Sequence, residues 1–160
     1  MARTPRMTRP PADDLRLATV VRVIYADTDQ MGFVYHGTYT RFLEAARVEY
    51  MRALGHTYAA VEAEGLGMPL TDLAISYIAP ARYDDLLSVQ VGVAEMSFAR
   101  LRLGYHVTVE PGDRVGLQAP LTVVFAETCH CCIRLADGRP TRFPDELRAT
   151  LLALANPEPE

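Results

Sequence analysis

The amino-acid sequence predicts a single α+β domain in which an antiparallel sheet of about five strands is wrapped around one long central helix. Two observations lead to this fold class. Residues 38–54 have the apolar spacing of an amphipathic helix, and most other apolar segments have the length and the β-branched composition of strands. A sheet with one apolar face needs a cover, and this helix is the only long one available to provide it.

The length and composition are those of one soluble domain. The chain has 160 residues, 49% of them hydrophobic, which is enough for a sizeable core. We expect the domain to cover residues 15–156, between a mobile tail at 1–14 and a short tail at 157–160. The net charge is −4 and the basic residues are spread along the chain, so the sequence predicts no basic surface for binding nucleic acid. No apolar stretch is long enough to span a bilayer, so we expect a cytoplasmic protein.

The long helix is the most strongly marked element. Its apolar residues, at positions 39, 42, 43, 46, 50 and 54, fall on one helical face. The opposite face is charged, and Glu44 lies three residues before Arg47 on it. This spacing allows side-chain contact on a helix, so we expect an ion pair between the two.

The remaining apolar segments predict strands and two shorter helices. In the segment 100–109, Leu101, Leu103 and Tyr105 alternate with Arg100 and Arg102, which is the pattern of a strand with one apolar face. By the same reasoning, strands are expected at 17–25, 71–79, 86–96, 100–109 and 121–135, and short helices at 58–64 and 144–155.

Two acidic residues, Asp27 and Asp29, stand just before the long helix. The N-terminus of a helix has unpaired amides and a positive dipole end, which favour negative charge. A carboxylate there can act as a general base or a nucleophile, and the amides can hold an oxyanion. The segment therefore predicts acyl-transfer chemistry. A purely structural role as turn-forming or capping acids remains the alternative.

Three cysteines and a histidine crowd into one predicted strand, at Cys129, His130, Cys131 and Cys132. Alternation along a strand places Cys129 and Cys131 on one face and His130 and Cys132 on the other. Side chains on opposite faces cannot easily surround one ion, so we expect core or interface packing with no metal and no cofactor.

Three segments, in this order, resemble a known family: YADTDQMGFVYH at 25–36, YTRFLEAAR at 39–47 and PARYDD at 80–85. Together they are similar to the hotdog-fold acyl-CoA thioesterases of the 4-hydroxybenzoyl-CoA thioesterase and YbgC type, over roughly residues 20–144. The resemblance implies a hotdog fold and hydrolysis of an acyl-CoA, or of an acyl-carrier-protein thioester, without a cofactor. It also implies a homodimer that can assemble further into a tetramer.

The resemblance also assigns roles at the acidic turn. Asp29 matches the catalytic carboxylate, and the backbone amide of His36 matches the group that polarises the thioester carbonyl. Gly32 and Val34 shape the turn between them, and Asp27 organises the loop.

Neighbouring residues complete the predicted substrate site. Tyr35 and Tyr39 lie on either side of the start of the long helix, where they either contact the substrate or pack as aromatic side chains. The segment at residues 96–100 lacks the basic cluster that some relatives use for the CoA nucleotide, so the resemblance does not assign the phosphate contacts, and single arginines are the candidates. The candidates are Arg82, Arg100, Arg139 and Arg142.

Other interpretations stay open from the sequence. Glu44 is a rival to Asp29, because another branch of the hotdog thioesterases uses a carboxylate on the helix. A hotdog dehydratase would need a histidine paired with an acid, and no such motif stands out. A non-catalytic acyl-thioester-binding protein would have no need for an acid beside the carbonyl, which argues against it.

Overall fold

The computed structural model describes residues 6–155 and divides them into strands, three helices and one short 3-10 turn. The strands are β1 (Arg16–Arg22), β2 (Leu66–Gly67), β3 (Leu70–Tyr77), β4 (Leu86–Met96), β5 (Arg100–Val109), β6 (Leu121–Cys131) and β7 (Ile133–Arg134). The helical elements are η1 (Tyr25–Asp27), α1 (Thr38–Ala53), α2 (Tyr58–Ala63) and α3 (Asp145–Ala155).

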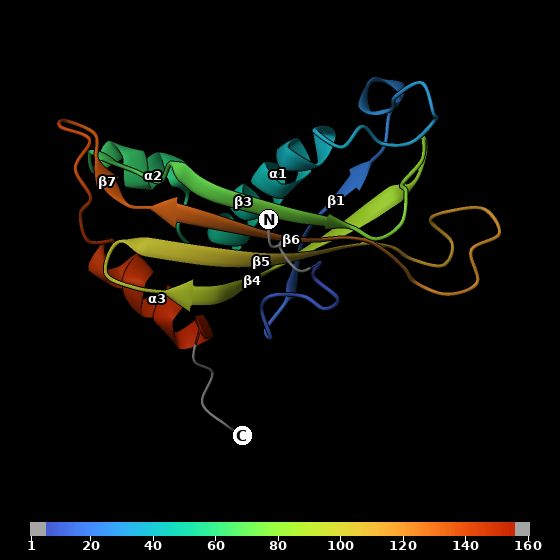
Figure 1. Cartoon of the computed structure of the whole chain (residues 1–160). Helices are drawn as coiled ribbons and strands as arrows, with labels where there is room; N and C mark the ends of the chain where they lie inside the picture. The colour runs from blue at the N-terminus through green and yellow to red at the C-terminus, as the bar shows by residue number, and fades with distance from the viewer. Residues whose placement is uncertain (1–5, 156–160) are drawn as a thin grey trace.

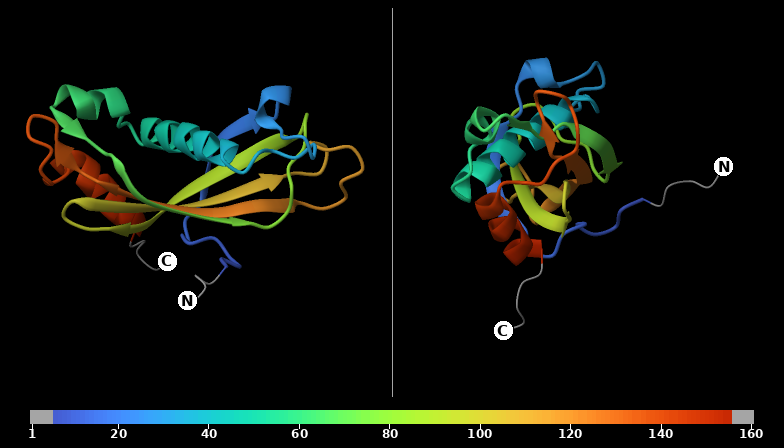
Figure 2. Two further views of the ribbon diagram at one scale, coloured as in Figure 1. Left: turned by 45° about the horizontal axis from the view of Figure 1, so that its top comes forward. Right: turned by 90° about the vertical axis from the view of Figure 1, so that its left-hand side faces the viewer.

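Five strands form one antiparallel sheet in the order β1-β4-β5-β6-β3, and β2 pairs with β7 in a small second sheet (Figure 1). The large sheet is curved, and α1 lies along its concave face (Figure 2). This is the hotdog fold, as the sequence predicted. The strands β1 and β3 are the two edges of the sheet.

The core lies between α1 and the sheet. The inward residues of β4 and β5 alternate as predicted, and Leu87, Val89, Leu101, Leu103 and Tyr105 are fully buried. Burying one large apolar side chain contributes roughly 1.5–3 kcal/mol, so this contact dominates the stability of the domain. The helix contributes one continuous face to it, made of Tyr39, Phe42, Leu43, Ala46, Tyr50 and Met51.

The first strand is shorter than predicted. The sequence favoured a strand over 17–25, whereas β1 ends at Arg22. Beyond it, the Val23 amide donates to the Asp85 carbonyl at 2.9 Å, and the Ile24 amide donates to the Asp27 carboxylate at 3.0 Å. These bonds turn the chain into η1, and β propensity alone could not reveal them.

The last long strand also ends early. A single strand was predicted over 121–135, but β6 stops at Cys131, and Ile133 and Arg134 pair with β2 instead. The break falls at Cys132, whose amide donates to the carbonyl of Ala99 at 2.7 Å. A partner distant in sequence therefore ends this strand.

The N-terminal segment at residues 6–14, predicted as part of a mobile tail, lies against the outer face of the sheet. Ala12 is buried there, and a Cβ atom on Gly104 would come within 2.8 Å of the Ala12 amide nitrogen, so glycine permits the close approach. At its start, the Met7 amide donates to Ser76 Oγ on β3 at 2.9 Å. The rest of the predicted tails, residues 1–5 and 157–160, lies outside the described residues.

The C-terminal helix α3 was predicted at 144–155, and it packs against β4 through Leu147 and Leu151. It lies at the end of the sheet remote from η1 (Figure 1). Between residues 6 and 155, no helix is both long and apolar enough to cross a membrane.

Candidate active site

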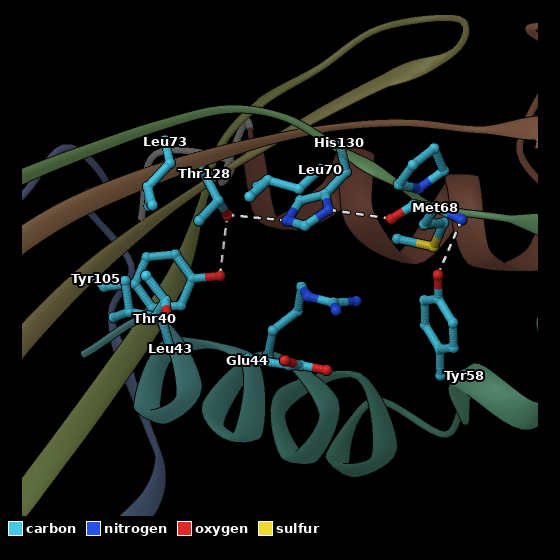
Figure 3. A pocket seen from close by; sticks show the side chains of 12 residues that line it. Thr40, Leu43, Glu44, Tyr58, Met68, Leu70, Leu73, Tyr105, Thr128 and His130 are labelled. Carbon is cyan, nitrogen blue, oxygen red and sulfur yellow. Dashed lines mark hydrogen bonds between the residues drawn. The ribbon is translucent and has the colours of Figure 1, made fainter. Parts of the chain in front are cut away.

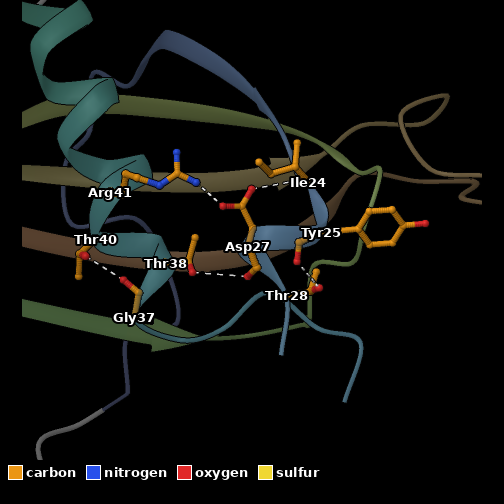
Figure 4. Close-up of polar contacts among 8 residues, drawn as sticks. All are labelled: Ile24, Tyr25, Asp27, Thr28, Gly37, Thr38, Thr40 and Arg41. Atoms are coloured by element: carbon orange, nitrogen blue, oxygen red, sulfur yellow. Dashed lines mark hydrogen bonds and ion pairs between the residues drawn. The ribbon is translucent and has the colours of Figure 1, made fainter. Parts of the chain in front are cut away.

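The first acid of the motif, Asp27, ties the loop to the start of α1 (Figure 4). It is buried, its carboxylate accepts the Ile24 amide at 3.0 Å, and the same carboxylate pairs with Arg41 on α1. Its backbone carbonyl accepts the Tyr35 amide at 2.9 Å and the Thr38 hydroxyl at 3.4 Å. With these oxygens engaged, Asp27 is suited to hold η1 against the first turn of the helix.

The second acid, Asp29, lies in a tight turn and is half-buried. Its Oδ1 accepts the Met31 amide at 2.9 Å, and its own amide donates to the Phe33 carbonyl at 2.8 Å. Gly32 closes the turn with a φ of 78°, a conformation that favours glycine. Within residues 6–155, Oδ2 of Asp29 makes no hydrogen bond, so one carboxylate oxygen is available to a ligand.

Four of the predicted site residues line one hollow of about 390 Å³: Asp29, Val34, His36 and Tyr39. The opposite wall is Tyr77 with the three residues after it. The Tyr77 hydroxyl donates to the His36 carbonyl at 3.0 Å, which ties the end of β3 to the start of the helix.

Some of the backbone amides just before α1 have no hydrogen-bond partner among the described residues. The Thr38 amide donates to the Tyr35 carbonyl at 2.9 Å, whereas the amides of His36 and Gly37 have no hydrogen-bond acceptor in the described part of the chain. They stand at the N-terminus of α1, where the helix dipole is positive. An oxygen that gains negative charge in the hollow would find donors there.

The two tyrosines of the motif differ in their surroundings. Tyr39 is buried, and this burial raises its pKa to about 12, so it stays a neutral phenol. Tyr35 is exposed and does not line the hollow; its ring centroid lies 4.2 Å from that of His36.

Arg82 lies beside this hollow rather than in it. A backbone bridge joins it to Phe33, and its side chain lines a neighbouring hollow of about 290 Å³. Two other arginines of that hollow are paired with carboxylates, Arg22 at 3.6 Å and Arg114 at 2.6 Å. Among residues 6–155, the Arg82 guanidinium has no such partner.

The other predicted phosphate contacts lie elsewhere. Arg100 begins β5, at the end of the sheet opposite the acidic turn. A ten-residue strand spans roughly 30 Å, so Arg100 is remote from Asp29 within one protomer. Arg139 and Arg142 belong to the segment between β7 and α3, and both of these elements lie at the same remote end (Figure 1).

A second cavity, of about 300 Å³, lies between the middle of α1 and the sheet (Figure 3). Three side chains form a chain of hydrogen bonds across it. Tyr105 Oη lies 3.0 Å from Thr128 Oγ1, which lies 3.0 Å from His130 Nε2, and His130 Nδ1 lies 3.2 Å from the Met68 carbonyl. A carbonyl can only accept, so Nδ1 carries the proton, and Nε2 accepts from Thr128.

Sequence reasoning missed this cavity. The alternation placed His130 on the face opposite Cys129 and Cys131 without showing which face is the inner one; in the structure His130 is buried, whereas Cys129 and Cys131 are half-buried. The available signal was the polar pair of Thr128 and His130 on an otherwise apolar face. Within residues 6–155, no three His, Cys, Asp or Glu side chains gather into a possible metal site.

The predicted ion pair between Glu44 and Arg47 is wrong: it is absent from the ion pairs of the described residues. The Arg47 guanidinium instead lies over the ring of Tyr58, 5.1 Å from its centroid. Glu44 is exposed, and both residues line the second cavity.

The hotdog fold of this chain is shared with solved thioesterase structures. The chain belongs to the Thioesterase-like superfamily, whose family model matches residues 23–151. It is 35% identical to the acyl-CoA thioesterase YbgC of Haemophilus influenzae over 130 residues, which cover 81% of this chain and 89% of that relative.

Two further relatives have more specific names. The chain is 31% identical to the 1,4-dihydroxy-2-naphthoyl-CoA hydrolase of Thermosynechococcus vestitus, over 81% of this chain and 84% of that one. Among solved structures, the DHNA-CoA thioesterase of Staphylococcus aureus superposes with a TM-score of 0.75 at 32% identity, covering 86% of this chain and 91% of that chain.

The two acids of the motif should differ in their effect on stability. We predict that Asp27→Ala lowers the free energy of unfolding by about 2–4 kcal/mol, because it leaves the Ile24 amide and Arg41 without their acceptor. Asp29→Ala removes one hydrogen bond at a half-exposed turn and should cost about 1 kcal/mol or less. Urea denaturation measures both; equal losses would refute the structural role of Asp27.

His130 should make stability depend on pH. Burial, with the nearby Arg47 charge, lowers its pKa from 6.5 to about 4. Between these two pH values the unfolded chain is protonated at His130 and the folded chain is not. The free energy of unfolding therefore falls as the pH drops from 6.5 toward 4, by up to about 3 kcal/mol. Nuclear magnetic resonance of the His130 ring should give a midpoint near 4. A midpoint at or above 6.5 would contradict the burial of the His130 ring beside Arg47.

Proposed function

We propose that this protein hydrolyses an acyl-CoA thioester to the free acid and CoA. The observation that carries the proposal is that one hollow is lined both by Asp29, whose carboxylate has a free oxygen, and by His36, whose amide is unpaired just before the N-terminus of α1. The names of the relatives support the same activity. Acyl-carrier-protein thioesters offer the same reacting group and are the alternative substrate.

In the proposed mechanism, the thioester carbonyl lies against the start of α1. The amide of His36 donates to the carbonyl oxygen, and this bond strengthens as the oxygen becomes an oxyanion; one such donor is typically worth about 3–4 kcal/mol. Asp29 either takes a proton from the attacking water or attacks the carbonyl carbon itself. By the first route, water adds to the carbonyl carbon, the C–S bond breaks, and the proton taken up by Asp29 passes to the sulfur of CoA. By the second, the C–S bond breaks as an anhydride forms between the acyl group and Asp29, and a water molecule then hydrolyses the anhydride and supplies the proton of the CoA thiol. Both routes need the same free carboxylate oxygen.

The CoA nucleotide is proposed to lie toward Arg82. This arginine is exposed, has no carboxylate partner among residues 6–155, and is joined through Phe33 to the turn of Asp29. A guanidinium is well suited to phosphate. Arg100 lies at the remote end of the sheet, which favours Arg82 within one protomer.

Two other functions remain as alternatives. A dehydratase would need a histidine side chain paired with an acid, whereas the exposed His36 ring lies against Tyr35. A non-catalytic binding protein would hold an acyl-CoA without breaking it. The free oxygen of Asp29 beside the unpaired amides favours hydrolysis over both.

We also propose a homodimer, which can assemble further into a tetramer. β3 is an edge strand, and Leu70, Leu73 and Tyr77 on it are 40–51% exposed. An exposed edge strand pairs readily with a second copy. Sedimentation at decreasing concentration should give a dimer whose dissociation is accompanied by loss of turnover. A monomer that keeps full turnover would overturn the proposal that activity depends on the pairing of two subunits.

Asp29→Asn tests the proposed chemistry. We predict that kcat/KM for the best substrate in a panel of short, medium, long and aromatic acyl-CoAs falls by about 10² or more, because the amide can neither accept a proton nor attack well. Thiol release measures the rate. Glu49→Gln makes the same kind of acid-to-amide change away from the hollow and is the control: Glu49 pairs with Arg52 on the surface of α1, and the variant should keep wild-type turnover.

Two results would change the assignment. A larger loss in Glu44→Gln than in Asp29→Asn would transfer the catalytic role to Glu44. Tight binding of an acyl-CoA that stays intact on prolonged incubation with the wild type would favour the non-catalytic binding protein.

A further inference from the structure

The second cavity forms a groove between α1 and the edge strand β3, and it starts close to the candidate active site. On α1, the groove residues Thr40, Glu44 and Arg47 lie on one side of the helix, because residues three or four apart share a helical face, and Thr40 directly follows Tyr39, which lines the hollow of Asp29. On β3, it is lined by Leu70 and Leu73, on the strand whose Tyr77 bonds the His36 carbonyl. We call this cavity the α1–β3 groove.

Most buried polar groups inside the α1–β3 groove are already paired. The hydroxyls of Tyr105 and Thr128 and both ring nitrogens of His130 are used in the hydrogen-bond chain (Figure 3). Arg47 is the exception: its Nη1 is buried and has no hydrogen-bond partner within residues 6–155. A buried charged donor without an acceptor is costly, so the groove is suited to a ligand that supplies one.

The charge inside the groove is positive. Burial lowers the pKa of His130 and the charge of Arg47 lowers it further; burial raises the pKa of Tyr105 to about 12, and the charge of Arg47 opposes that rise, so Arg47 is close to both groups. The neutral His130 adds no charge. Among residues 6–155, Glu44 is the one acid that lines the groove, and it is exposed, so water hydrates its charge. A carboxylate matches this environment, because a guanidinium can bind both of its oxygens.

We propose that the α1–β3 groove binds the far end of the acyl group, and that Arg47 selects acyl groups carrying a carboxylate at that end. The proposal rests on the proposed thioesterase function, because the hollow of Asp29 then holds the other end of the same substrate. Leu43, Leu70 and Leu73 provide apolar surface for the carbon chain between the two ends.

The length of the substrate follows from the geometry of α1. Arg47 comes ten residues after Gly37, so it lies about 15 Å further along the helix axis. Its side chain leans back toward the helix N-terminus. An extended chain of single bonds advances about 1.2 Å per bond, so about 8–12 bonds separate the thioester carbonyl from the carboxylate.

Calorimetric binding of two non-hydrolysable probes tests the proposal. Both are thioethers of CoA with an alkyl chain of about 12 bonds, the length set by the helix, and one ends in a carboxylate while the other ends in a methyl group. At neutral pH the wild type should bind the carboxylate probe about 10- to 100-fold more tightly. Arg47→Met should remove this preference, and Arg47→Lys, which keeps the charge without the planar fork, should retain part of it.

The control is Arg52→Met, an exposed arginine of the same helix paired with Glu49, which should keep the wild-type preference. Thermal melting checks that each variant is folded. Equal affinities for the two probes in the wild type, or a full preference in folded Arg47→Met, would overturn the proposal.

The same probes separate this proposal from the proposed function. If the wild type hydrolyses acyl-CoAs but binds both probes equally, the carboxylate site is refuted and the thioesterase stands. If it prefers the carboxylate probe but hydrolyses no thioester, the site is supported and the thioesterase is refuted.

Discussion

The contact between α1 and the concave face of the sheet determines where every candidate functional group lies. One apolar face of the helix is buried against the fully buried residues of β4 and β5. This contact fixes the position of α1 on the sheet. The N-terminus of α1 therefore lies beside η1 and the end of β3, and the middle of α1 lies opposite His130. The hollow of Asp29 and the α1–β3 groove therefore both lie along α1, and the rigid helix keeps the distance between them constant.

Burial separates the roles of two acids that are only two residues apart. Asp27 is enclosed and its carboxylate is engaged by a backbone amide and by Arg41, so it is suited to connect the loop and the helix. Asp29 is half-buried and keeps one oxygen free. A carboxylate that is fully bonded is stabilised as a structural group, whereas one that is partly bonded retains capacity for a substrate.

Much of this arrangement was predictable from the sequence. The periodicity gave the bounds of β4 and β5 without error, and the motif order indicated the fold and brought Asp29, Val34, His36 and Tyr39 together. The rest depends on contacts between distant segments. The end of β6 is set by Ala99, and Arg47 turns away from Glu44 toward Tyr58, which lies on another helix. Local spacing contains no information about such partners.

The N-terminal segment bears on how the protein should be handled in the laboratory. It crosses the outer face of the sheet over Gly104 and reaches β3, where Met7 bonds Ser76 and Arg6 bonds the Tyr77 carbonyl. A purification tag or fused reporter added ahead of this segment would therefore emerge beside the edge strand proposed to pair with a second copy. Added after α3, which packs on β4, the same tag would leave from a different part of the surface and keep that edge accessible.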